Sequence, residues 1–209
     1  MVLIHHIPPL ITKIFPQMVW HKDRGESKVY LTFDDGPVPD VTDFVLDELG
    51  KRGLKATFFM VGDNVRKNPT LAMKVMDRGH KIGNHTFHHI DGYKTKTEDY
   101  LKEVESCHHM IEQVTGIKTK LFRPPYGKIT RDQFGKLKSD HEVIMWDVLS
   151  GDYDPQQSPE LCLSKSKQYT QNGSIILFHD QEKTHKVLRA VLPSFLEFLV
   201  KEGFETHLL

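Results

Sequence analysis

Short apolar runs alternate with amphipathic stretches along most of the chain. The apolar runs predict β-strands at 28–33, 56–61, 81–83, 120–122, 143–148, 174–178 and 205–209. Apolar residues with a period near 3.6 predict helices at 41–51, 68–78, 97–115, 131–139, 159–169 and 185–202. This alternation indicates an α/β fold with a parallel sheet covered by helices, arranged either as an open doubly wound sheet or as a barrel, complete or incomplete.

Local signals mark several helix ends. Asp40, Thr97 and Ser158 stand at the starts of helical stretches, where their side chains can accept hydrogen bonds from the first free N–H groups. Gly116 follows the longest helical stretch, and glycine readily adopts the left-handed conformation that ends many helices. We therefore expect N-caps at the first three positions and a C-terminal stop at the fourth.

The first 26 residues differ from the rest. They begin MVLIHHIPPLITKIFPQMVW, an apolar stretch that three prolines and two histidines interrupt. It is too broken for a transmembrane helix, and it lacks the basic start and the small-residue cleavage site of a signal peptide. We expect residues 1–26 to pack on a single domain at 27–209, with a trimmed anchor as the alternative. Absence of a signal peptide favours a cytoplasmic location, whereas a cell-wall substrate would suit an extracytoplasmic one.

Composition excludes several functional classes. Lys plus Arg and Asp plus Glu number 28 each, so the chain has no overall attraction for nucleic acid.

The two cysteines do not suggest a disulfide framework, and we expect free thiols at Cys107 and Cys162. No feature predicts an oligomeric state. Thirteen histidines among 209 residues direct attention to metal chemistry.

Polar side chains collect where the predicted strands end. They are Asp34 and Asp35, then His85, His88 and His89, then Arg123 and Tyr126, then Asp147 and Asp152, and finally His179 and Asp180. In parallel α/β folds, active sites form at the carboxyl ends of the strands. We therefore expect most of these side chains to meet in one cleft.

Two carboxylates and two histidines in this set suit a metal site. Adjacent acids repel each other, and a cation beside one of them relieves the conflict while the other stays free as a base. His85 and His89 lie four residues apart, which on a helix or tight turn puts both rings on one side and His88 elsewhere. Two histidines and one Asp leave positions open for water and substrate, as in catalytic zinc sites, and the same donors suit iron(II).

The segment Arg123-Pro124-Pro125-Tyr126-Gly127 predicts a rigid turn. Such a turn can aim a backbone N–H at a developing oxyanion, and its arginine can hold a carboxylate through two nitrogens. His179 ends a buried strand and could donate a proton near neutral pH. Taken singly, each feature also fits an ordinary surface turn or strand end.

Together, these segments resemble the polysaccharide deacetylases with a NodB homology domain, carbohydrate esterase family 4. TFDDGP at 32–37, HTFHH at 85–89, RPPYG at 123–127 and LFH at 177–179 occur in the family's order. The resemblance runs from about residue 28 to the end of the chain. It implies a distorted, incomplete (β/α) barrel of seven or eight units.

The resemblance also implies residue roles. Asp34 is similar to the family's general base, and Arg123 to the residue that orients it. The expected metal ligands are Asp35, His85 and His89, and His179 resembles the acid that protonates the departing amine. The expected substrate contacts are Pro124, the backbone N–H of Tyr126, Tyr153 and Leu177, with Leu177 beside the acetyl methyl.

The activity implied is removal of N-acetyl groups from glycans that contain N-acetylglucosamine, such as peptidoglycan or chitin, with release of acetate. The implied cofactor is one divalent ion, Zn²⁺ foremost, with Co²⁺, Ni²⁺ or Fe²⁺ as alternatives. Two other hypotheses stay open: a hydrolase of another non-peptide C–N bond in the same barrel, and a catalytically silent carbohydrate-binding protein.

One motif departs from the family pattern. Leu149 stands where the family has an Asp that pairs with the catalytic histidine, and Tyr153 stands where it has Trp. Asp147 lies two residues before Leu149, on the same face of a strand. We therefore expect Asp147 to act as the partner of His179.

Overall fold

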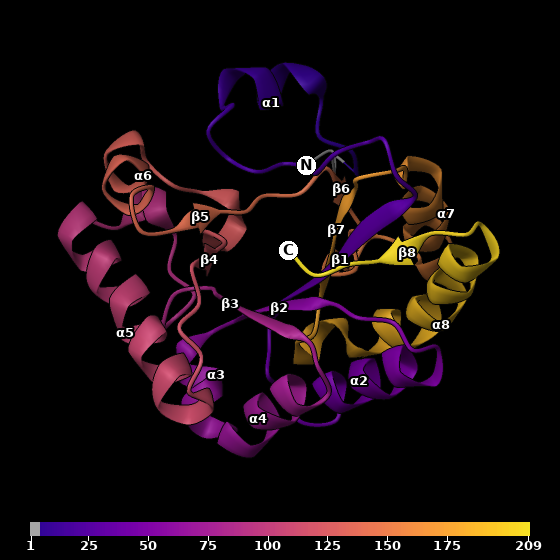
Figure 1. The fold of residues 1–209 in the computed structure, drawn as a ribbon, viewed down its shortest axis with the longest axis horizontal. Helices are drawn as coiled ribbons and strands as arrows, with labels where there is room; N and C mark the ends of the chain where they lie inside the picture. The colour runs from indigo at the N-terminus through magenta and orange to yellow at the C-terminus, as the bar shows by residue number, and fades with distance from the viewer. Residues whose placement is uncertain (1–4) are drawn as a thin grey trace.

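One curled parallel sheet forms the centre of the computed structural model, which describes residues 5–209 (Figure 1). Its strands are β1 Lys28–Asp35, β2 Thr57–Met60, β3 Lys81–Asn84, β4 Leu121–Phe122, β5 Glu142–Val143, β6 Val148–Leu149, β7 Ile175–His179 and β8 Glu205–Thr206. Their order is β5-β4-β3-β2-β1-β7-β6, and β8 pairs with the beginning of β1. Because β5 and β6 stand at the two ends of this order and do not pair with each other, the barrel is incomplete, which confirms the expected fold.

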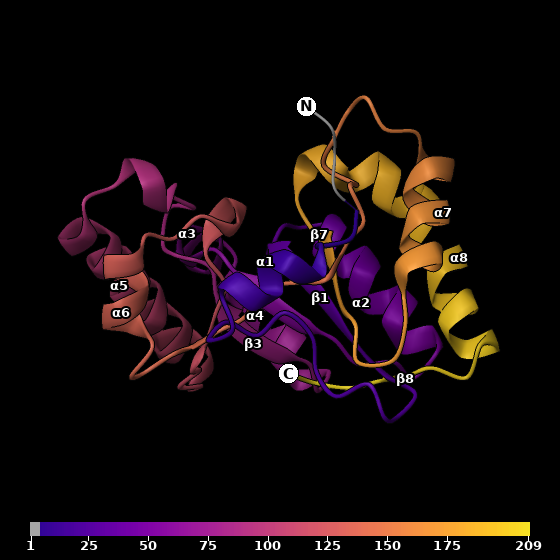
Figure 2. The same ribbon diagram turned by 90° about the horizontal axis from the view of Figure 1, so that it is seen from above.

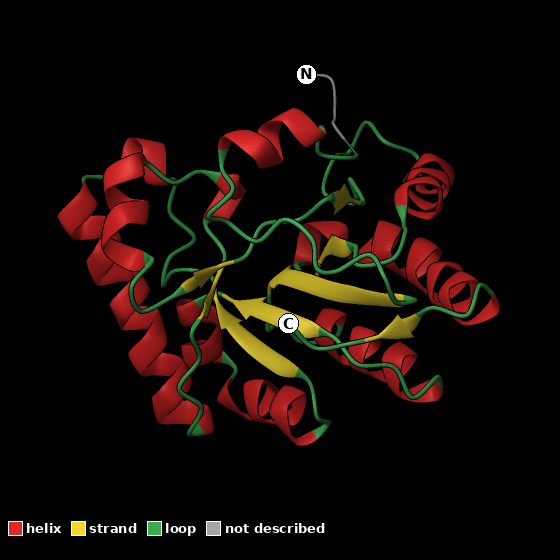
Figure 3. Ribbon diagram, turned by 45° about the horizontal axis from the view of Figure 1, so that its top comes forward, coloured by secondary structure: helices red, strands yellow, loops and turns green. Residues whose placement is uncertain are grey.

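Helices cover the outside of the sheet (Figure 3). They are α2 Val41–Lys51, α3 Gly62–Lys67, α4 Pro69–Asp77, α5 Thr97–Thr115, α6 Arg131–Leu137, α7 Pro159–Tyr169 and α8 His185–Lys201, with α1 Pro9–Ile14 in the N-terminal segment. Short 3₁₀ turns occupy Gly92–Lys94, Pro125–Gly127 and Glu182–Thr184. Helices α7 and α8 pack together on one flank, and α5 and α6 pack together on the other (Figures 1 and 2).

The predicted elements agree with the structure except at a few places. In place of one strand at 143–148 the structure has the two short strands β5 and β6. Between them, Ile144 and Met145 hydrogen-bond to Val19 of the N-terminal segment. Helix α3 was not predicted. Ser158 caps α7 and Gly116 ends α5 with a φ of 72°, as expected, and Asp40 lies at the N-cap of α2. Thr97 is the first residue of α5 rather than its cap, which is Lys96.

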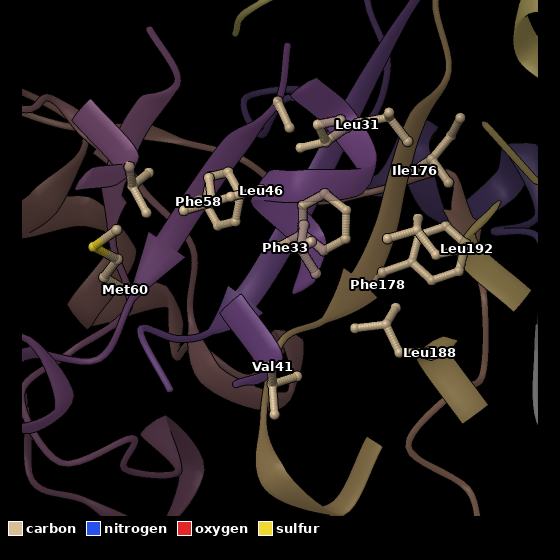
Figure 4. Close-up of a cluster of buried hydrophobic side chains, with 14 of the residues drawn as sticks. Leu31, Phe33, Val41, Leu46, Phe58, Met60, Ile176, Phe178, Leu188 and Leu192 are labelled. Atoms are coloured by element: carbon tan, nitrogen blue, oxygen red, sulfur yellow. The ribbon is translucent and has the colours of Figure 1, made fainter. Parts of the chain in front are cut away.

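Alternation along the strands separates an apolar outer face from a mixed inner face. Leu31 and Phe33 of β1 point outward into a cluster with α2 and α8 (Figure 4). Phe33 stacks on Phe58 of β2, with ring centroids 5.2 Å apart. Burial of a side chain of this size stabilises the fold by about 1.5–3 kcal/mol. The inward-facing Thr32 instead hydrogen-bonds to an arginine inside the barrel, so the outer core supports an inner face that carries polar groups.

The N-terminal segment lies against the two end strands. His6 pairs antiparallel with Val148 of β6, and Val19 pairs parallel with Ile144, just after β5. The ring of His6 also stacks on Tyr169, at 5.2 Å between centroids. Residues 5–21 therefore cover the side on which the sheet is open. None of the helices within residues 5–209 is both long and apolar enough to cross a bilayer.

Just after this segment, the half-buried Arg24 forms an ion pair with a buried carboxylate. Asp147 is almost fully buried, and Arg24 Nη2 donates to its Oδ2 at 2.8 Å. The backbone N–H of Ile175 and the hydroxyl of Ser174 donate to the same carboxylate at 2.8 and 3.1 Å. Burial raises the pKa of Asp147, and the hydrogen bonds and the charge of Arg24 oppose that rise.

Replacement of Arg24 by Ala should lower the free energy of unfolding by about 1–3 kcal/mol at neutral pH, because it leaves a buried carboxylate without its cation. The loss should shrink as the pH falls, because a protonated Asp147 needs no cation. Chemical denaturation at two pH values measures both effects, with the exposed Arg131→Ala on α6 as control. An R24A protein as stable as the wild type would show that Arg24 does not support Asp147.

Candidate active site

A cavity of about 400 Å³ opens at the carboxyl ends of the strands. Its lining comprises Asp34, Asp35, His85, His89, Tyr126, Lys128, Trp146, Leu149, Tyr153, Leu177, His179, Gln181 and Lys183. The strand ends of β1, β3 and β7 and the turn after β4 all contribute to it. The expected convergence of polar residues occurs for six of them, Asp34, Asp35, His85, His89, Tyr126 and His179. The others of that set, His88, Arg123, Asp147, Asp152 and Asp180, do not line the cavity.

Three potential metal ligands meet in this cavity. Atoms of Asp35, His85 and His89 that could bind an ion lie within 4.8 Å of one another. Asp35 Oδ1 lies 3.0 Å from His89 Nε2 and 3.6 Å from His85 Nε2. This oxygen is buried and accepts no hydrogen bond from the described residues. A buried carboxylate oxygen without a donor, facing two imidazole nitrogens, fits a divalent cation.

His85 is held in the form that a metal ligand requires. Its Nδ1 lies 2.7 Å from the backbone carbonyl of Arg123. A carbonyl only accepts, so Nδ1 carries the hydrogen and Nε2 presents a lone pair toward Asp35. Burial lowers the pKa of His85 to about 4, against the opposing charge of Asp34, so the ring is neutral at neutral pH.

The Asp35 carboxylate is held in its charged form. Burial alone would raise its pKa, but the close approach of His89 Nε2 to Oδ1 and the nearby imidazoles of His179 and His85 bring it well below the usual range. A charged carboxylate beside a neutral imidazole is the ligand combination that a divalent cation prefers.

The backbone around these ligands is strained. Asp35, Thr86, His89 and Tyr126 have φ angles of 84°, 61°, 54° and 60°. Each such conformation costs a non-glycine residue about 1–3 kcal/mol, and it persists only where the surroundings hold it. Asn64 Nδ2 donates to the carbonyl of Asp35 at 2.7 Å, and the N–H of Gly62 donates to that of Thr86 at 3.0 Å. Such strain is typical of ligand-binding loops.

Asp34 has a different partner from its neighbour. Arg123 is fully buried, and its Nη1 donates to Asp34 Oδ1 at 2.7 Å and to Thr32 Oγ1 at 2.8 Å. The other guanidinium nitrogens donate to the carbonyls of Met145 and Ile144. Because those nitrogens are occupied, Arg123 holds Asp34 through one nitrogen rather than the two expected. Asp34 Oδ2 still lies 3.7 Å from His85 Nε2, beside the candidate metal site.

His179 has Asp152 as its partner. Asp152 Oδ1 lies 2.8 Å from His179 Nδ1, and Oδ2 accepts the backbone N–H of His179 at 2.8 Å. The hydroxyl of Ser150 also donates to Asp152 Oδ1, at 2.9 Å. One oxygen of this buried carboxylate therefore holds the imidazole of His179, and the other holds its backbone.

The expectation that Asp147 pairs with His179 is wrong. The register pairs Val148 with Ile176, which places Asp147 beside Ile175, at the start of β7. His179 lies four residues further along that strand, or about 13 Å at about 3.3 Å per residue. Asp152 reaches the level of His179 because the chain turns at Gly151, where φ is 79°.

The pairing with Asp152 makes His179 a strong base. Burial alone would lower the pKa of His179, but the charge of Asp152 and its hydrogen bond, with smaller contributions from Asp35 and Asp34, raise it to about 9. The ring is therefore protonated at neutral pH. Its Nδ1 is bound to Asp152, so the proton available to the cavity is the one on Nε2.

Other walls of the cavity are aromatic or apolar. Tyr126 packs its ring edge-on against His89, with centroids 4.6 Å apart, and Tyr153 does the same with His179 at 5.1 Å. Leu177 lines the cavity, as expected, whereas Pro124 is buried and does not.

The sequence predictions missed several lining residues. These are Lys128, Trp146, Leu149, Gln181 and Lys183. Lys128, Leu149, Gln181 and Lys183 follow predicted strands and Trp146 lies within one, and only these positions could have indicated them. His88 lies outside the cavity, as expected, with Nδ1 2.8 Å from Glu103.

If the protonated ring of His179 drives turnover, activity should fall as the pH rises through about 9. Asp152→Asn removes the charge that raises this pKa, so the alkaline limb of kcat/KM should move to lower pH. A pH–rate profile measures the shift, with Asp154→Asn as a control that removes a nearby charge that does not contact the ring. An unchanged alkaline limb in the D152N protein would remove His179 from the proton-transfer step.

The sequence matches a known protein family and curated relatives. The family model described as polysaccharide deacetylase matches residues 21–142. Peptidoglycan-N-acetylglucosamine deacetylase PgdA of Listeria monocytogenes is 30% identical over 184 residues, 88% of this chain and 38% of that protein. The chain thus spans well under two thirds of that curated relative.

Solved structures show the same architecture. The Bc1960 peptidoglycan N-acetylglucosamine deacetylase, in complex with 4-naphthalen-1-yl-N-oxidanyl-benzamide, has a TM-score of 0.90 at 26% identity, over 97% of this chain and 95% of that chain. BA3943, a CE4 family pseudoenzyme from Bacillus anthracis, has a TM-score of 0.81 at 25% identity, over 91% of this chain and 66% of that chain.

Proposed function

Because this chain belongs to the polysaccharide deacetylase family, we propose that it removes acetyl groups from N-acetylglucosamine units of a peptidoglycan- or chitin-like glycan. One observation carries the proposal. Three metal-ligating side chains face one point, a second carboxylate lies beside them, and a protonated histidine lines the same cavity. Hydrolysis of an amide needs activated water and a proton for the departing amine, and this arrangement provides groups for both.

Asp35, His85 and His89 would hold one divalent ion. The unpartnered Oδ1 of Asp35 and the neutral ring of His85 fit such an ion, and Zn²⁺ suits this donor set best, with Co²⁺, Ni²⁺ or Fe²⁺ as alternatives. When bound, the ion supplies Lewis-acid activation of water and of the amide carbonyl.

Asp34 serves as the general base in this proposal. Its carboxylate takes a proton from the attacking water, and Arg123 holds it in position through Oδ1. Oδ2 is the oxygen that faces His85 and the ligand cluster, so it is the atom that accepts the proton. Arg123 also compensates the charge of Asp34, which leaves Asp35 as the carboxylate that attracts the cation.

His179 donates a proton to the nitrogen that leaves. Its Nε2 is the donor, because Asp152 occupies Nδ1. Tyr126 has a left-handed backbone conformation in the turn after β4. The backbone N–H of Tyr126 would stabilise the oxyanion. Leu177 and Leu149 offer an apolar wall for the acetyl methyl, and Tyr153 forms a further wall beside His179.

The alternatives make different predictions in one assay. Defined N-acetylglucosamine oligomers are incubated with the protein, with and without a chelator, and acetate is measured. Metal-dependent release supports the deacetylase. A bound ion without acetate release would favour hydrolysis of another C–N bond or a silent carbohydrate-binding protein, the latter in keeping with the likeness to a pseudoenzyme.

Replacement of Asp34 by Asn should preserve the ion and reduce turnover by about 10²–10⁴-fold, the usual contribution of a general base. Metal analysis of the purified variant, with acetate release under saturating substrate, separates the two effects. Near-wild-type turnover in the D34N protein would contradict the assignment of the base.

Replacement of His85 by Ala should cost the ion itself, because it removes one of three protein ligands. Metal content after dialysis against a defined Zn²⁺ buffer measures this loss. His88→Ala is the matched control, because His88 lies three residues away and contacts Glu103 outside the cavity. Equal metal content in the H85A and H88A proteins would take His85 out of the ligand set.

A further inference from the structure

Gln181 makes a contact that the chemistry above does not use. It lies two residues after His179 and lines the cavity. Its side-chain Nε2 donates a hydrogen bond to Asp35 Oδ2, across 146 positions of sequence. The two oxygens of Asp35 therefore differ: an amide holds Oδ2, whereas Oδ1 faces the two imidazoles without a donor.

Hydrogen bonds from neighbouring residues fix the backbone on both sides of Gln181. Thr184 is fully buried, and its single hydroxyl hydrogen is shared between the carbonyl of His179, at 2.6 Å, and that of Gln181, at 2.9 Å. Asp180 accepts the N–H of Gly36 at 3.1 Å and the hydroxyl of Thr42 at 2.6 Å. The end of β7 is thus fastened to the residue that follows Asp35.

Space between the two segments is tight as well. A Cβ atom on Gly36 would lie 2.1 Å from Asp180 Oδ2, so only glycine fits there. Asp35 itself has a strained backbone, whose carbonyl is held by Asn64. One amide therefore holds the main chain of Asp35 and another holds its side chain.

We infer that Gln181 is a positioning residue that keeps Asp35 as a one-oxygen ligand of the divalent ion. With Oδ2 held by the amide, only Oδ1 is directed at the cation, which keeps coordination positions open for water and substrate. Gln181 is neutral, so it orients Asp35 without cancelling the charge that attracts the cation. Arg123, by contrast, both orients Asp34 and compensates its charge. This inference rests on the proposed metal site.

Titration of metal-free protein with Zn²⁺ or Co²⁺ alone tests the inference. Gln181→Met keeps the length of the side chain and removes the donor, and it should weaken metal affinity by about 10–100-fold, the usual effect of losing such a contact. The visible absorption of the Co²⁺ form should change, because both oxygens of Asp35 could then reach the ion. Gln168→Met, at an exposed position of α7, is the matched control.

A second variant tests whether the donor must be neutral. Gln181→Lys restores a donor but adds a positive charge beside Asp35, so it should also weaken metal binding. Relative to wild type, the Q181M protein should lose more thermal stability with Zn²⁺ bound than without it, because the contact serves the ion in addition to the buried carboxylate.

Wild-type affinity and an unchanged Co²⁺ spectrum in the Q181M protein would overturn the inference, as would wild-type affinity in Q181K. A Q181M protein that is destabilised equally with and without metal would assign Gln181 a purely structural role, and this result would also overturn the inference. Asp35→Ala separates this failure from that of the proposed function. If D35A retains the ion, the metal site itself is wrong. If D35A loses it and Q181M does not, only the role of Gln181 is wrong.

Discussion

Two carboxylates at consecutive positions repel each other, and the inner face of the sheet is arranged around that repulsion. Asp34 and Asp35 end the central strand β1, where neither can move away from the other. The conflict is resolved by giving each a different environment: a buried guanidinium for Asp34, and two imidazoles with an amide for Asp35. Removal of either environment would leave a buried charge uncompensated, which is among the most expensive changes a protein interior can suffer. The distinct chemistry of the two acids thus follows from electrostatics rather than from any difference between them.

Packing on the apolar side of the same strands offsets the free-energy cost of burying these charged groups. Phe33, between Thr32 and Asp34, points outward into a cluster that joins the sheet to α2 and α8. A fully buried arginine is costly to desolvate, and Arg123 offsets the cost by donating to a carboxylate, a hydroxyl and two carbonyls, with its guanidinium 4.1 Å from the ring centre of Phe59. The apolar outer core stabilises the sheet, and this stability allows the inner face to hold charged groups in fixed positions.

Much of this organisation can be predicted from the sequence, and the limits have physical causes. Period and composition predict the strands and most helices, and polar residues at strand ends predict where the cavity lies. Residue type and spacing predict a site of two histidines and one of the two acids, and the family resemblance identifies that acid as Asp35. The partner of His179 does not, because Asp147 and Asp152 both follow the same apolar run and only the strand register and the turn at Gly151 distinguish them. Gln181 is equally invisible, because its contact joins residues 146 positions apart. The local sequence pattern indicates the type of each element and which of its faces is buried. It says little about which residues far apart in the sequence make contact.

Arg123 contributes to the two halves of the site through different chemical groups. Its side chain holds Asp34, while its backbone carbonyl sets the tautomer of His85. A substitution at this position would remove the first contact and leave the second, since every amino acid carries the carbonyl. The capacity to retain a cation is therefore separable in evolution from the capacity to cleave an amide. Loss of Arg123 alone would leave Asp34 as an unpaired buried charge, so a descendant of this fold that lost both side chains could lose turnover and persist as a cation-loaded scaffold.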